Sequence, residues 1–328
     1  MKLKDPITVK GLQLVNRLVM PPMATHKAKE GKVPQELCDY YAARAAGSYV
    51  GLVITEHSYI DPRGKADPYM VSVADDCDMD SLCRLTEAIH EAGDSRVFCQ
   101  MNHAGSSTSS LVTGTRLEAP SAVLHPTWKD AEMPLEMSRN DIERVVEEFA
   151  ASAGRAKKAG YDGVEIHSAH GYLLNQFYSP LTNRRSDRYG GETVAERLTI
   201  HKEVIAAVRS EVGDSFPVAM RLGGCDYMEG GSTIEDSVTA AGILEKAGID
   251  LLDITGGMCR YMIVDGKEPG FFSDMTTAIK KKIKIPVILT GGIRTVEDAE
   301  RFLNNGAADM IGIARPMLKD AAWAKTHL

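Results

Sequence analysis

The sequence predicts an α/β protein folded as a (β/α)8 barrel, and three observations support this prediction. Eight short strand-like runs recur along the chain of 328 residues. Helical patterns with readable ends lie between the runs. The glycine-rich turn G-x-G-x-x-G, which a doubly wound dinucleotide-binding sheet usually carries after its first strand, is absent. A barrel of this kind is also about as long as this chain.

The eight runs are rich in apolar and β-branched residues. They lie at residues 17–23, 51–56, 96–101, 162–167, 217–222, 250–255, 286–291 and 309–314. Near-continuous apolar strands that alternate with helices indicate parallel pairing with both faces of the sheet covered. No Pro/Ser-rich linker divides the chain, so we expect one barrel domain over residues 1–328.

The helices between the strands have start and stop signals. Four starts match the S/T-x-x-D/E capping box: Ser138 with Asp141, Thr193 with Glu196, Thr233 with Asp236, and Thr295 with Asp298. Six helices stop at a glycine, the usual left-handed residue past a helix end: Gly47, Gly93, Gly160, Gly213, Gly248 and Gly306.

Two segments fall outside the repeating unit. The opening stretch ITVKGLQLVNRLV predicts a β-hairpin around Lys10-Gly11 that closes the bottom of the barrel. The segment from about Ser106 to Ser138 is a long excursion after the third strand. Long loops on compact barrels are usually functional, so we expect a lid.

Composition narrows the class of protein. The net charge of −7 gives no reason to expect a nucleic acid or an anionic membrane as partner. No apolar run reaches the roughly 20 residues that a membrane span needs, and no signal-peptide pattern opens the chain. The six cysteines form no C-x-x-C pair, so no zinc ribbon or iron–sulfur cluster is indicated. Reduced thiols in the cytoplasm fit best.

Polar residues stand at the carboxyl ends of the predicted strands, where barrels of this type build their active sites. These positions are Met23, Glu56, Gln100, Asn102, His103, His167, Arg221, Thr255, Gly291 and Arg315. Buried polar groups need partners, so their convergence predicts a bound polar ligand.

The last two strands end in LTGGIR and IARPML. The loops after these strands are the common phosphate site of such barrels, because backbone N–H groups face the anion there. Gly291, Gly292 and Arg315 suit that task. The alternative is that the glycines only form a tight turn and Arg315 is a surface charge.

His167 and His170 could serve three purposes. With His103 as a third ligand they could hold a metal ion; they could brace a loop through hydrogen bonds; or they could face a substrate. Their position beside Tyr172 at the mouth of a barrel favours the third interpretation.

The stretch HSAHGYLLNQFYSPLTNRRSDRYGG resembles the signature of the Old Yellow Enzyme family of FMN-dependent ene reductases. The resemblance covers nearly the whole chain, through NRLVMPPMAT at the first strand, QMNHAG at the third, MRLGG at the fifth, and TGGI and IARPML at the end. The long signature is highly specific, whereas TGGI alone is weak. The resemblance implies a TIM barrel that holds FMN without a covalent bond.

By matching motifs, the resemblance implies that FMN contacts Pro22, Met23, Ala24, Gln100, Arg221, Gly291, Gly292, Ala314 and Arg315. His167 and His170 match the pair that grips a substrate's carbonyl oxygen, and Tyr172 matches the proton donor. NADH or NADPH would reduce the flavin, and an α,β-unsaturated carbonyl compound of the enone or enoate type would then oxidise it. The resemblance leaves a homo-oligomer open.

Other activities stay open at this stage. The same flavin barrel could act as an NADH oxidase, an amine demethylase or an electron-carrying subunit. A metal-dependent lyase or hydrolase is a further alternative, although no convincing carboxylate set accompanies the histidines, and we expect no metal.

The chain departs from the family pattern in several places. Ala24 stands where one bacterial branch has a flavin-tuning cysteine, and His26 stands where that branch often has a tyrosine that contacts the substrate. We expect His26 to contact the substrate and His103 to brace a loop. Longer relatives continue into a cysteine-rich cluster motif, which is not found before Leu328, so we expect either a stand-alone barrel or a truncated chain.

Overall fold

The eight predicted strands close into a parallel barrel in the computed structural model, which describes residues 2–263, 266 and 268–328. Pairing between neighbours runs round the ring, and the β3–β13 and β4–β6 pairs complete it. In chain order the strands are β3 (Leu18–Met20), β4 (Leu52–Ile54), β6 (Arg96–Asn102), β9 (Gly163–Ser168), β10 (Val218–Cys225), β11 (Leu251–Gly256), β12 (Val287–Thr290) and β13 (Met310–Gly312). The predicted (β/α)8 fold is confirmed.

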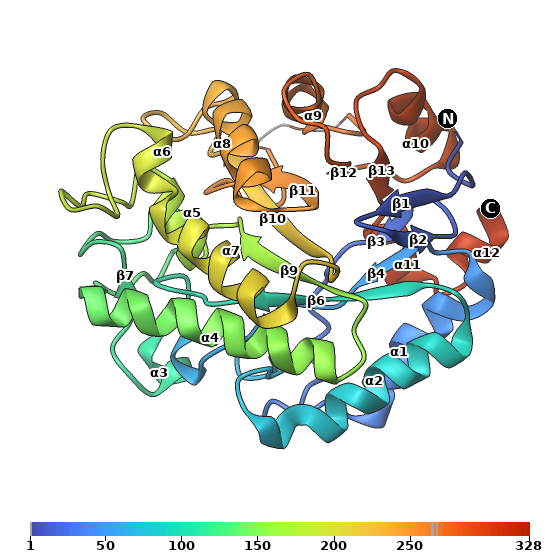
Figure 1. Cartoon of the computed structure of the whole chain (residues 1–328), viewed down its shortest axis with the longest axis horizontal. Coiled ribbons are helices and arrows are strands. Elements are labelled where there is room, and N and C mark those ends of the chain that lie inside the picture. The colour runs from blue at the N-terminus through green and yellow to red at the C-terminus, as the bar shows by residue number, and fades with distance from the viewer. Residues whose placement is uncertain (1, 264–265, 267) are drawn as a thin grey trace.

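Helices surround the ring (Figure 1). The main ones are α1 (Gln35–Ala45), α2 (Met79–Ala92), α4 (Arg139–Lys158), α7 (Thr199–Val212), α8 (Ile234–Ala247), α9 (Ser273–Lys280), α10 (Val296–Asn304) and α11 (Arg315–Lys319). The shorter elements are α3 (Ser110–Thr113), α5 (Leu173–Tyr178), α6 (Val194–Arg197), α12 (Trp323–His327), and strands β5 (Ser58–Tyr59), β7 (Glu118–Ala119) and β8 (Leu135–Glu136). None of the described helices is both long and apolar enough to span a membrane.

Most predicted strand ranges were one to three residues too long at an end. The first strand ends at Met20 rather than at residue 23, because Pro21 and Pro22 have no N–H group to donate to a neighbouring strand. The fifth strand instead runs on to Cys225, with an irregular register between Gly223 and Cys225.

The predicted helix caps are largely correct. Three of the capping boxes are complete, and at the fourth Thr295 accepts from the Asp298 backbone N–H without the reciprocal bond to the cap's own N–H. Gly93 is a correction: its φ of 169° is extended, not left-handed. A Cβ at this position would lie 2.7 Å from the carbonyl oxygen of Ala45, so the close approach of two segments explains the glycine.

The predicted hairpin closes the bottom of the barrel. β1 (Ile7–Val9) and β2 (Leu12–Leu14) pair antiparallel across Lys10 and Gly11, which have φ values of 48° and 82°. Val9 and Leu14 are fully buried, and they pack against the first inward layer of the barrel: Val19, Leu52, Phe98, Ala219, Leu251, Ile288 and Met310. The floor is therefore apolar, and the polar strand ends gather at the opposite face.

Candidate active site

A cavity of about 480 Å³ opens at the carboxyl ends of the barrel strands. Every residue expected to contact FMN or substrate borders it: Pro22, Met23, Ala24, His26, Gln100, His167, His170, Tyr172, Arg221, Gly291, Gly292, Ala314 and Arg315. These residues come from six of the eight strand ends or the loops that follow them. Four other polar residues at predicted strand ends do not border the cavity: Glu56, Asn102, His103 and Thr255. One cavity of this volume, with polar groups converging on an apolar lining, is typical of a cofactor or substrate site.

His167, His170 and Tyr172 form one wall of the cavity. His167 lies on β9, His170 follows in a left-handed conformation with φ of 61°, and Tyr172 caps the N-terminus of α5. This tight turn brings both other rings within 5.1 Å of the His167 ring, measured between centroids. The left-handed residue at position 170 is what turns its imidazole back towards that of His167.

The protonation of these three side chains follows from their burial. Burial lowers the pKa of His167 and of His170 well below the usual value for histidine, and the nearby Arg221 adds to both shifts. Burial raises the pKa of Tyr172 to about 12. At neutral pH the wall therefore presents two uncharged imidazoles and a protonated phenol, and each can donate a hydrogen bond.

The two imidazoles have different supports. The Nε2 atom of His170 lies 3.0 Å from the hydroxyl of Thr255 on β11. The Nδ1 atom of His167 is buried and has no hydrogen-bond partner among the residues that the structure describes. Leaving a buried polar atom without a partner costs stability.

His57 is a cavity residue that the sequence analysis missed. It follows β4, and its ring lies 5.4 Å from the Tyr172 ring and 6.2 Å from the His167 ring. The amide nitrogen of Asn102 lies 3.1 Å from its Nδ1, and burial lowers its pKa to about 4. The sequence does contain a signal for it, because in TEHSY His57 directly follows Glu56 at the end of the second predicted strand.

A layer of paired polar side chains lies between the cavity and the apolar floor. The Nε2 of Gln100 donates a hydrogen bond of 2.8 Å to Glu165. The Nε of Arg221 lies 3.1 Å from a carboxylate oxygen of Asp253, whose other oxygen accepts from Thr290 at 3.3 Å. Because Gln100 and Arg221 also border the cavity, they can present an amide and a fixed positive charge to a ligand.

Hydrogen bonds to Glu56, which follows the second barrel strand β4, fix the turn that carries Met23 and Ala24. The Glu56 carboxylate accepts from the backbone N–H of Thr25 at 3.0 Å and from its hydroxyl at 2.8 Å. Burial raises the pKa of Glu56 to about 7, against the opposing effect of these two hydrogen bonds. Glu56 therefore supports the site from outside the cavity.

The glycines after β12 form a close-packed corner. Gly292 has a φ of 74°, in the left-handed region. A Cβ at Gly292 would lie 2.9 Å from the ring of Phe271, and one at Gly291 would lie 3.0 Å from the ring of Phe272. Both positions therefore require glycine. Arg315 follows the neighbouring strand β13 and borders the same cavity, so backbone N–H groups and a cation can face an anionic group here.

His103 lies outside the cavity lining. Its Nδ1 accepts from the backbone N–H of Gly105 at 3.1 Å, its carbonyl accepts from Leu173 at 2.9 Å, and its ring packs against Gly64. These contacts match the expected bracing of the loop. Among the described residues, no group of three or more His, Cys, Asp or Glu side chains is arranged to hold a metal ion.

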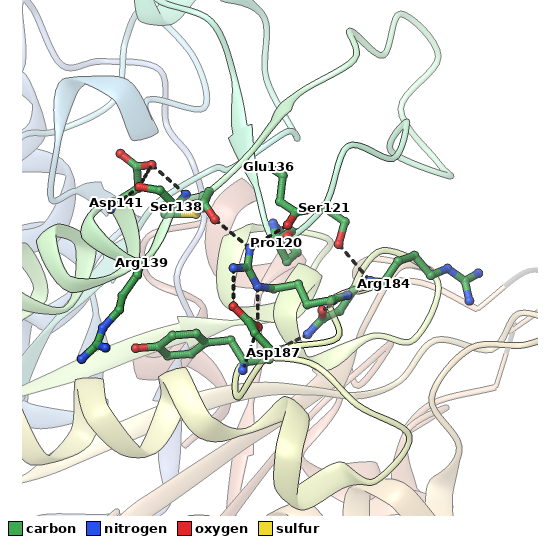
Figure 2. Close-up of polar contacts among 12 residues, drawn as sticks. Pro120, Ser121, Glu136, Ser138, Arg139, Asp141, Arg184 and Asp187 are labelled. Atoms are coloured by element: carbon green, nitrogen blue, oxygen red, sulfur yellow. Dashed lines mark hydrogen bonds and ion pairs between the residues drawn. The ribbon is translucent and has the colours of Figure 1, made fainter.

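The long excursion after β6 is tied to the signature segment (Figure 2). The Arg185 guanidinium donates to the carbonyls of Pro120, at 2.9 Å, and Met137, at 2.7 Å, and it forms a two-point ion pair with Asp187. Further along the excursion, His125 lies 2.9 Å from the carbonyl of Gly171. The excursion thus packs directly on the turn that positions His170 and Tyr172.

Comparisons of this sequence with a family profile and with known proteins indicate the same family. The sequence profile of the NADH:flavin oxidoreductase / NADH oxidase family matches residues 2–327. The chain is 40% identical to an NADH oxidase of Thermoanaerobacter brockii over 96% of its own length and 48% of the relative's. It is 37% identical to an NADPH dehydrogenase of Bacillus licheniformis over 99% of its own length and 93% of the relative's. The chain thus spans about half the length of the first of these relatives.

Solved structures agree with the sequence comparison. An old yellow enzyme homologue from Zymomonas mobilis superposes with a TM-score of 0.85 at 30% identity, covering 99% of this chain and 92% of the other. A 2-naphthoyl-CoA reductase superposes with a TM-score of 0.93 at 27% identity, covering 99% of this chain and 52% of the other. The resemblance to Old Yellow Enzyme is confirmed: this chain belongs to the NADH:flavin oxidoreductase / NADH oxidase family, whose members are FMN-dependent NAD(P)H oxidoreductases.

Proposed function

We propose that the chain is an ene reductase, which uses NADH or NADPH to reduce the activated C=C bond of α,β-unsaturated carbonyl compounds. The observation that carries this proposal is the cavity wall of His167, His170 and Tyr172, with two neutral imidazoles beside a protonated phenol. Flavin oxidation by oxygen alone needs no such set of hydrogen-bond donors, whereas reduction of an enone uses each of them.

The residues of the cavity fit FMN. Pro22, Met23 and Ala24 would border the ring, and Gln100 and Arg221 would meet its polar pyrimidine side. The corner of Gly291, Gly292, Ala314 and Arg315 would hold the phosphate. When bound, FMN supplies hydride transfer, which no side chain can provide. The positive charge of Arg221 would favour the reduced form of the ring.

His167 and His170 would bind the carbonyl oxygen of the substrate. Hydride addition to the β-carbon moves negative charge onto this oxygen, and donors fixed in advance stabilise that charge without reorganising. In comparable sites one such donor contributes about 3 kcal/mol to the stability of the transition state. Because both rings are uncharged, their N–H groups remain hydrogen-bond donors rather than titrating at neutral pH.

Tyr172 would protonate the α-carbon. Its hydroxyl keeps its proton at neutral pH, since its pKa is about 12, and it lies on the same wall as the two imidazoles. A general acid placed in this way typically contributes 10²- to 10⁴-fold to the rate. The nicotinamide cofactor would use the same cavity before the substrate does, and a ping-pong cycle follows. His26, 59% exposed at the rim, would contact the substrate.

The relative from Thermoanaerobacter brockii supports NADH oxidase activity as a second candidate. An anaerobic experiment distinguishes the two. The FMN-loaded protein should lose its yellow colour with NADH or NADPH, and 2-cyclohexenone should restore it. Recovery of the colour only after oxygen is admitted would favour the oxidase and contradict the ene reductase.

A further inference from the structure

Two fully buried acids, Glu165 on β9 and Asp253 on β11, lie in the polar layer beneath the cavity. Neither borders the cavity itself. Asp253 has a positive partner, because the Nε of Arg221 lies 3.1 Å away. Among the residues that the structure describes, the Glu165 side chain accepts its hydrogen bond instead from the uncharged amide of Gln100. The two acids therefore have different electrostatic surroundings, although they share one layer.

The contact between Glu165 and Gln100 is well placed but incomplete. The Nε2 of Gln100 donates to one carboxyl oxygen of Glu165 at 2.8 Å, and the strand register sets the two residues opposite each other. The other carboxyl oxygen is buried and has no partner in the described part of the chain. Leaving such an atom unpaired costs stability, so packing alone does not explain an acid at this position.

The hydrogen bond fixes which end of the Gln100 amide faces the cavity. With Nε2 directed at Glu165, the carbonyl oxygen is left for the ligand. The pyrimidine ring of FMN carries an N–H group between two carbonyls, and this group needs an acceptor. The opposite amide orientation would direct an N–H at an N–H. This step depends on the proposed position of FMN beside Gln100.

We propose that Glu165 is a positioning residue with two effects on bound FMN. First, Glu165 holds the Gln100 amide so that the amide oxygen faces the cavity. Second, the negative charge of ionised Glu165 weakens the preference of the site for reduced FMN over oxidised FMN. Reduced FMN is more negative than oxidised FMN, so an ionised carboxylate beneath the ring opposes reduction. Arg221 has the opposite effect, and the two residues together set how strongly the site prefers reduced FMN over oxidised FMN.

The charge of Glu165 depends on pH. The groups that face it are Arg221 on β10, Asp253 on β11, the neutral Gln100 on β6 and, further along its own strand, the uncharged His167. Burial and Asp253 raise the pKa of Glu165 to about 8, and Arg221 opposes this shift. The acid is therefore protonated well below about pH 8 and ionised well above it. Its effect on reduced FMN should grow as the pH rises.

The test uses FMN-loaded protein and two substitutions. Glu165→Gln keeps an acceptor for Gln100 but removes the charge, and Glu165→Leu removes both. The readouts are the midpoint potential of bound FMN, measured by spectroelectrochemistry, and the FMN dissociation constant, measured by fluorescence. Glu148→Gln is the matched control, because Glu148 is another acid of raised pKa but lies on the outer helix α4.

For Glu165→Gln we expect the preference for reduced over oxidised FMN to equal that of the wild type near about pH 6, where both side chains are neutral. Near about pH 9 the preference should be roughly tenfold stronger than in the wild type, which is about 30 mV for a two-electron couple. For Glu165→Leu we expect FMN to bind about tenfold more weakly at both pH values. Glu148→Gln should change neither quantity.

A Glu165→Gln potential that follows the wild type across the whole pH range would overturn the charge effect. Unchanged FMN affinity in Glu165→Leu would overturn the positioning effect. If Glu165→Leu does not fold, Glu165→Gln decides the charge effect, and Glu165→Met, which is close to glutamate in size but has no oxygen acceptor, decides the positioning effect. Gln100→Leu separates this inference from the proposed function: if it leaves FMN affinity unchanged, FMN does not lie beside Gln100. If it weakens FMN binding while the Glu165 variants behave as wild type, only the role of Glu165 is wrong.

Discussion

Replacing Tyr172 by phenylalanine tests the proposed proton transfer. The substitution removes one hydroxyl group and keeps the ring, whose centroid lies 5.1 Å from that of His167 and 5.4 Å from that of His57. The wall should therefore keep its shape. The lost group is a general acid, so we expect reoxidation of the reduced enzyme by 2-cyclohexenone to slow by about 10²- to 10⁴-fold, or roughly 3–5 kcal/mol in activation free energy.

Stopped-flow absorbance measures the two half-reactions separately. Reduction of the flavin by NADPH needs no proton at the substrate's α-carbon, so its rate in Tyr172→Phe should stay within about threefold of the wild type. Tyr261→Phe is the control, because Tyr261 also borders the cavity but is 62% exposed. It should leave both rates near the wild-type values. If both half-reactions of Tyr172→Phe slowed together, the proton-donor role would be wrong.

Three further predictions concern the rest of the site. Replacing both His167 and His170 by alanine should weaken the binding of phenolic ligands, which mimic the enolate, by about tenfold or more. A spectral titration of the FMN-loaded protein measures this affinity. Unchanged affinity would show that the two histidines do not bind the carbonyl oxygen of the substrate. The pKa of Glu56 is raised to about 7 in the folded protein, so ionising this side chain destabilises the fold. The stability that protonated Glu56 contributes is therefore fully present below about pH 4.5 and is lost as the pH rises through about 7. Thermal unfolding of Glu56→Gln should therefore depend less on pH than that of the wild type between about pH 5 and 8, and equal slopes would contradict this. Gly292→Ala should weaken FMN binding by about tenfold or more. Gly11→Ala is the control, because Gly11 also has a positive φ but lies in the floor hairpin; it should lower the melting temperature without changing FMN affinity. Equal loss of FMN affinity in both variants would contradict a role of Gly292 in binding the phosphate.

The barrel could be predicted because its signals are local. Short apolar runs, capping boxes and helix-ending glycines recur in a regular order along the chain, and each depends on only a few neighbouring residues. Of two errors, one has a local cause and the other does not. The first strand is cut short by Pro21 and Pro22, and Gly93 is required by contact with Ala45, a residue 48 positions away that no local pattern reveals.

The residues of the cavity could be predicted in part. Residues at strand ends and in the signature could be placed because the fold brings strand ends together. His57 was missed although it follows a strand end directly. Tyr261 and Phe271, which also border the cavity, were missed because they belong to no predicted strand end and to no motif. The pairing of Gln100 with Glu165 also escaped prediction, since it depends on the register between β6 and β9.

We expect FMN to lie in this cavity with His167, His170 and Tyr172 facing its ring. A crystal structure of the protein with FMN and a bound phenol would show whether it does. We predict that the phenol's oxygen lies within hydrogen-bond distance, about 2.7–3.2 Å, of a ring nitrogen of each histidine, above the flavin ring. A phenol bound elsewhere, or a flavin ring that does not face these three side chains, would show that the proposed site is wrong.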